Sequence, residues 1–118
     1  MKSTIISFAA ACKKLKIKTA LPVVTDLPKK HQKAMIAHYK LTIIAEALND
    51  GWQPDWKNYD QGKYYPWFEV TKSGFSFVIV DYDYWNANAG SRLCFRSREL
   101  AEYAGKLFTD IYNDFLSI

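Results

Sequence analysis

Several patterns that mark secreted and membrane proteins are missing from this 118-residue sequence. Its two cysteines, Cys12 and Cys94, are too few for a disulfide framework, so we predict two free thiols. No run of about 18 apolar residues occurs, which excludes an apolar transmembrane helix and argues against a membrane partner. The apolar run before Cys12 is short for a secretion signal and lysines follow it at once, so we expect a cytoplasmic protein.

The residue patterns of the common catalytic and metal sites are also missing. There is no glycine-rich phosphate loop, no nucleophile elbow and no zinc spacing. His31 and His38 lie two helical turns apart, which is too far to share one metal ion. Cys94 has no histidine near it in sequence, and Asp81 with Asp83 forms an isolated pair of carboxylates on one strand face. We therefore predict no catalytic residue, no metal site and no cofactor.

Two features of the composition do point to binding. Aromatic residues make up 16% of the chain, and rings at that density build either a core or a binding face. Charge is also uneven, because residues 1–40 carry nine lysines against the single acid Asp26, whereas residues 41–118 carry seven basic and eleven acidic residues. A basic end suits an anionic partner, although solvated lysines that keep a small protein soluble would look the same.

The amino-terminal half is expected to be helical. A short helix is predicted over residues 7–15, with Ser7 as its cap. A longer helix is predicted over residues 28–49, because apolar residues such as Leu41, Ile44 and Leu48 fall on one arc. A second apolar arc on another side places this helix at the centre of the domain.

The second half is expected to form strands and a final helix. Alternation predicts strands over residues 63–71, 75–84 and 91–96, joined by connections too short for parallel crossovers. Ser97 is predicted to cap the last helix, whose buried stripe is Leu100, Ala104, Leu107, Phe108, Ile111 and Phe115. The order is ααβββα, an α+β domain covering residues 1–118. A three-stranded antiparallel meander then packs against the central helix and the amphipathic carboxyl-terminal helix.

Five strings in the chain are distinctive. They are Ala-Leu-Asn-Asp-Gly-Trp at 47–52, Pro-Asp-Trp at 54–56, Lys-Tyr-Tyr-Pro-Trp-Phe at 63–68, Gly-Ser-Arg-Leu-Cys-Phe at 90–95 and Ser-Arg-Glu-Leu-Ala-Glu-Tyr-Ala-Gly-Lys at 97–106. Together they resemble a group of small uncharacterised proteins encoded by phages and prophages of gut anaerobes. The group has no assigned activity, so the resemblance implies a phage-like setting and no site residue.

The first functional hypothesis is a non-catalytic accessory protein that binds single-stranded nucleic acid. Rings and guanidinium groups on an open sheet stack bases, and the predicted strands would place such a set on one face. This set is Tyr65, Trp67, Arg92 and Arg96.

The alternative is a protein–protein adaptor or inhibitor that docks through the polar, Trp-rich loop 51–62. Trp and Tyr dominate the energetics of protein interfaces, and the loop carries Trp52, Trp56 and Tyr59. An enzyme of unknown type is the third hypothesis.

Overall fold

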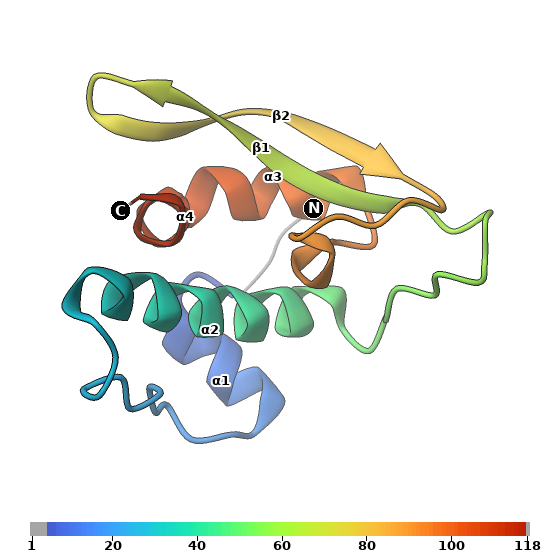
Figure 1. The fold of residues 1–118 in the computed structure, drawn as a ribbon. Coiled ribbons are helices and arrows are strands. Elements are labelled where there is room, and N and C mark those ends of the chain that lie inside the picture. Colours follow the sequence, from blue (N-terminus) through green and yellow to red (C-terminus); the bar gives the residue numbers. More distant parts are fainter. Residues whose placement is uncertain (1–4, 118) are drawn as a thin grey trace.

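The computed structural model describes residues 5–117, which form four α-helices, one two-stranded antiparallel sheet and a short 3-10 helix (Figure 1). The predicted α+β class is confirmed, but the predicted order ααβββα with three strands is wrong. The elements are α1 (Phe8–Leu15), α2 (Lys29–Asn49), β1 (Lys63–Thr71), β2 (Gly74–Asp83), η1 (Ser91–Leu93), α3 (Arg98–Leu107) and α4 (Thr109–Leu116).

The two predicted amino-terminal helices are confirmed almost to the residue. The Ser7 hydroxyl accepts a hydrogen bond from the Ala10 N–H at 3.1 Å and so caps α1. Helix α2 begins after Pro28 and ends where Asp50 adopts a left-handed conformation. It lies between α1 on one side and α3 with α4 on the other (Figure 1), so the central position expected of it is confirmed.

The sheet is a hairpin of β1 and β2 joined by a tight turn at Lys72 and Ser73. Even-numbered side chains of β1 face α3 and α4: the Phe68 ring lies 4.6 Å from the Tyr112 ring of α4. Gly105 of α3 lies directly beneath Pro66 and Phe77, where any side chain would collide with the hairpin. Odd-numbered side chains of β1 point to the opposite face, and Figure 1 shows no helix on that side.

The predicted third strand over residues 91–96 does not form. Residues Ser91–Leu93 make the 3-10 helix η1, and only Phe95 pairs with the sheet, through an isolated bridge to Tyr64. Continuing the ladder past Phe95 would set Leu93 opposite Pro66, which has no N–H to donate. The Leu93 N–H is also already used, because it donates to the Gly90 carbonyl at 2.9 Å. The buried Asn49 side chain donates to the Cys94 carbonyl and accepts from the Arg96 N–H, both at 3.0 Å. These bonds satisfy the Cys94 and Arg96 groups, which point away from β1, and hold the segment against α2.

The predicted carboxyl-terminal helix is interrupted at Phe108. Its cap is confirmed, because the Ser97 hydroxyl accepts from the Leu100 N–H. Past Leu107 the backbone bends and buries the Phe108 side chain, while the Thr109 hydroxyl donates to the Gly105 and Lys106 carbonyls. Leu107, expected in the buried stripe, is instead 47% exposed because the bend turns it away from the core.

Candidate functional site

The four residues predicted to bind nucleic acid lie in separate places. Tyr65 and Trp67 share the odd-numbered face of β1, but Tyr65 is buried, with its hydroxyl 3.5 Å from the Ser91 hydroxyl. Burial raises the pKa of Tyr65 above its ordinary value. Arg92 lines a cavity beside α2, and the exposed Arg96 lines neither that cavity nor the groove beside Trp67. The expectation that the predicted strands place all four on one sheet face is wrong, because residues 91–96 form no strand.

We call the uncovered side of the hairpin the outer face and define it by Trp67, Glu69, Ile79 and Asp81. Trp67 pairs with Ile79 across the two strands, and their side chains are 53% and 58% exposed. Such a pair normally stabilises a sheet by packing under a second layer. Glu69 and Asp81 take part in no ion pair among residues 5–117. The outer face is therefore apolar at its centre and carries acid on either side.

The Trp-rich loop is held down by Lys63, the first residue of β1. The Lys63 side chain is fully buried, and Nζ donates to the carbonyl oxygens of Asp55 at 2.8 Å, Asn58 at 3.2 Å and Tyr84 at 3.0 Å. Its ammonium also lies 4.8 Å from the centre of the Trp56 ring. Three donors thus meet three acceptors, and the loop is closed against both strands. Sequence reasoning missed Lys63 because its partners are backbone carbonyls, which no residue pattern identifies.

The residues predicted for the protein-binding alternative are consequently not equivalent. Trp56 is half-buried over Lys63, and Trp52 is half-buried in the wall of a cavity. Tyr59 is 64% exposed and makes an edge contact with Trp85 at 6.1 Å between ring centres. Of the three loop aromatics, Tyr59 is the one most available to a partner.

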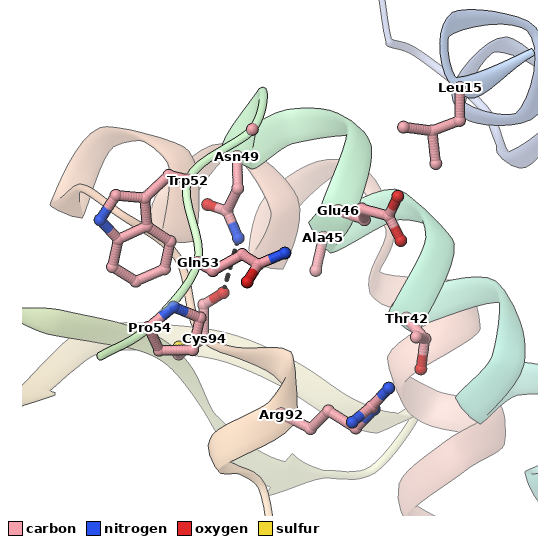
Figure 2. Close-up of a pocket in the computed structure, with 11 residues that line it drawn as sticks. Leu15, Thr42, Ala45, Glu46, Asn49, Trp52, Gln53, Pro54, Arg92 and Cys94 are labelled. Carbon is pink, nitrogen blue, oxygen red and sulfur yellow. Dashed lines mark hydrogen bonds between the residues drawn. The ribbon is translucent and has the colours of Figure 1, made fainter. Parts of the chain in front are cut away.

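A cavity of about 560 Å³ lies between α2, the Trp-rich loop and η1 (Figure 2). Arg92 extends into it from η1 toward α2, and Trp52 lines its other end. The hydrogen bond between Asn49 and Cys94 closes the back wall, as the dashed line in Figure 2 shows. The structure thus brings together Arg92 and Trp52, which the sequence had assigned to different sites. The cavity offers a guanidinium at one end and an indole at the other, with the Glu46 carboxylate also in its lining.

Cys94 in the wall of this cavity is poorly suited to be a nucleophile. Burial raises the pKa of the Cys94 thiol to about 11, so the thiol stays protonated at neutral pH and is a poor nucleophile. Among residues 5–117, no histidine lines this cavity to act as a base for the thiol. Cys12 and Cys94 are both buried free cysteines, as predicted. Cys94 therefore acts as a small wall residue.

Asp83, the last residue of β2, is used locally. The Asp83 carboxylate accepts hydrogen bonds from the backbone N–H groups of Tyr84, Trp85 and Asn86 at 2.7, 3.1 and 3.0 Å. These bonds hold the pKa of Asp83 below its ordinary value. No group of three or more His, Cys, Asp or Glu side chains in residues 5–117 is arranged to hold a metal ion. Asp83 shapes the turn after β2.

A narrower apolar groove of about 200 Å³ runs beside β1, and we call it the edge groove. Four consecutive residues of β1, from Tyr65 to Phe68, form one wall, and Tyr112, Phe115 and Leu116 of α4 form another. Since neighbouring residues of a strand point to opposite faces, four in a row can line one groove only where it follows the strand edge.

Comparisons with known proteins found no similar protein. No family model, curated protein or solved structure matches this chain. None of the helices within residues 5–117 has the length and apolar character needed to cross a bilayer. The function is therefore inferred from the geometry of the sites.

Proposed function

We propose that this chain is a non-catalytic accessory protein that binds another protein through the outer face of its hairpin. The observation that carries the proposal is the pair formed by Trp67 and Ile79, which are directly opposed and both more than half exposed. Val78, the neighbour of Ile79 in β2, is also 48% exposed. Contiguous exposed apolar side chains usually mark interaction surfaces, and Trp is a frequent anchor of protein interfaces.

The charge on this face favours a protein over a nucleic acid. Glu69 and Asp81 flank the exposed pair, and among the described residues neither is neutralised by a cation. Phosphate groups approaching Trp67 would meet these carboxylates, whereas a basic protein segment would be attracted to them. Nucleic-acid binders instead surround their stacking rings with lysine and arginine.

The test compares partner capture by matched variants. Trp67→Ala should abolish retention of the partner from a lysate of the native host, since hot-spot tryptophans commonly contribute 2 kcal/mol or more, about 30-fold in affinity. Trp85→Ala is the control, because Trp85 is 62% exposed but lies in the turn after β2. Equal capture by both variants, with unchanged circular dichroism, would refute the proposal.

A second candidate function, binding of single-stranded nucleic acid, is favoured by one observation. Arg92 and Trp52 line the same cavity, and Arg92 makes no ion pair within residues 5–117. Fluorescence anisotropy with a labelled oligonucleotide at two salt concentrations tests this candidate. Salt-sensitive binding that is lost in Arg92→Ala would support it, and binding that ignores both salt and the substitution would reject it.

A further inference from the structure

Strand β1 has one paired edge and one edge that is largely free. Tyr64 exchanges two hydrogen bonds with Phe95, from N to O at 3.0 Å and from O to N at 2.8 Å. In an antiparallel strand the backbone groups of alternate residues point to the same edge, so Pro66, Phe68 and Val70 follow Tyr64 along it. Within residues 5–117 no backbone hydrogen bond from another segment reaches these three residues.

Pro66 supports this assignment of the free edge. Proline has no N–H, so inside a sheet it is confined to positions whose N–H would face away from the ladder. Pro66 lies opposite Val80 of β2. Its neighbours Tyr65 and Trp67 make the backbone hydrogen bonds to β2, so the backbone of Pro66 points to the other edge of β1. The unpaired donors on the free edge are therefore those of Phe68 and Val70.

The edge groove lies along this same edge. Its far wall is formed by α4 and by residues around η1, which contribute Tyr112, Phe115, Leu116 and Leu93. These side chains are apolar over most of their length, and they face the helix side of β1. A chain lying on the free edge would place every second side chain in this groove.

The other side chains of such a chain would emerge on the outer face. There they would lie beside Trp67 and Glu69, with Asp81 across the hairpin. The two carboxylates have no ionic partner in the described part of the chain. Charge complementarity at this face thus requires lysine or arginine.

We propose that the partner binds by adding a strand to the free edge of β1, with apolar side chains in the edge groove alternating with basic side chains on the outer face. This inference rests on the proposed function and specifies how the partner docks. Main-chain hydrogen bonds to Phe68 and Val70 supply affinity, and the alternating side chains supply specificity. A second copy of β1 fits less well, because antiparallel pairing about Phe68 sets Val70 against Pro66, which has no N–H to give.

The probe is an amidated peptide of about eight residues in which Val alternates with Lys, roughly the length of an ordinary strand. The control peptide has the same composition with all lysines in one block. The alternating peptide should bind at least tenfold more tightly than the control in a nuclear magnetic resonance titration of the full chain. It should also slow amide exchange at Phe68 and Val70 about tenfold or more, and leave Tyr65 and Trp67, which face β2, unchanged.

Backbone methylation of the peptide separates strand addition from other modes of docking. Methylating the nitrogens of one alternate set should weaken binding roughly tenfold, and methylating the other set should leave it intact, because only one set faces β1. If both methylated peptides bind equally and amide exchange at Phe68 and Val70 is unaltered, strand addition is wrong. Partner capture that depends on Trp67 would in that case still support the proposed function. Absence of binding at about millimolar peptide, or dimerisation of the chain through this edge, would also overturn it.

Discussion

Replacing Lys63 by methionine would remove the group that closes the Trp-rich loop and leave the length of the side chain nearly unchanged. The ammonium donates to three carbonyl oxygens, of Asp55 and Asn58 in the loop and of Tyr84 after β2, at 2.8, 3.2 and 3.0 Å. In Lys63→Met all three carbonyls lose this donor. Those of Asp55 and Asn58 lie in exposed residues that water can reach after a small displacement of the loop.

The magnitude follows from the number of bonds that water cannot replace. A hydrogen bond to a charged group contributes about 1.5–3 kcal/mol net, so the loss of one to two such bonds should cost roughly 2–4 kcal/mol. The cation–π contact with Trp56 at 4.8 Å acts in the same direction. Domains of this kind are stable by about 5–15 kcal/mol, so the substitution removes a large share of the total. The midpoint of thermal unfolding should fall by about 10 °C.

Urea unfolding followed by tryptophan fluorescence measures this loss, with Lys57→Met as the matched control. Lys57 is an exposed lysine of the same loop, and its replacement should change stability by about 0.5 kcal/mol or less. Trypsin should also cleave the loop of Lys63→Met faster, because the segment around Asn58 is released from the sheet. If Lys63→Met is destabilised no more than Lys57→Met, the three carbonyl contacts do not stabilise the fold and the reasoning fails.

Two other substitutions test long-range and local polar contacts. Asn49→Ala should destabilise the protein by about 2–4 kcal/mol, because it leaves the buried Cys94 carbonyl and the Arg96 N–H without their partner. Urea unfolding measures this loss, with Asn86→Ala, a substitution at an exposed asparagine, as the control. Asp83→Asn should destabilise the protein at pH 7, and this effect should vanish in acid. The pKa of Asp83 is lowered in the folded state, so its stabilisation is fully present above the unfolded value of about 3.9 and is lost as pH falls through the folded pKa. An Asp83→Asn effect that persists at about pH 2 would contradict the assigned role of the carboxylate.

Helix α2 and the hairpin could be predicted from sequence because their signals are local. The apolar arcs of α2 span 21 residues, and Leu41 and Ile44 on them are each 1% exposed. The hairpin is specified by alternation on either side of a tight turn at Gly74, which adopts a φ of 115°. These features involve residues close together in the chain, where period and turn chemistry act directly.

The third strand was predicted wrongly because its alternation had another cause. Leu93, Cys94 and Phe95 are buried in a row, which is not the alternation of a half-exposed strand. The backbone groups of Cys94 and Arg96 bond to Asn49, 45 and 47 positions away. No local pattern in residues 91–96 indicates that these contacts with α2, and a proline in β1, will leave the segment with a single bridge. The grouping of Arg92 and Arg96 with Trp67 depended on that strand, and its basis is lost with it.

The site was harder to predict than the fold because it depends on which face of the hairpin the helices leave uncovered. Trp67 was selected from the sequence as a binding residue, and its exposure keeps it a candidate. Its neighbours on the outer face, Ile79 and Asp81, follow from the register of β1 with β2, which contains an irregularity between Trp67 and Phe68. A shift of one residue reverses the face of every side chain beyond it, so the composition of the surface could not be derived without coordinates.

Pro66 also affects how copies of this protein behave when they are crowded together. A free strand edge flanked by apolar side chains is the usual template for fibril growth, because each added copy presents the same edge again. Pro66 leaves a gap in the row of donors, and the irregularity between Trp67 and Phe68 bends the hairpin nearby. One incoming strand can bond to Phe68 and Val70 on one side of the gap, since Phe95 already pairs with Tyr64 on the other, but a stacked ladder would repeat the missing bond in every layer. The hairpin can thus keep an edge open for a partner and still resist growing into a fibre.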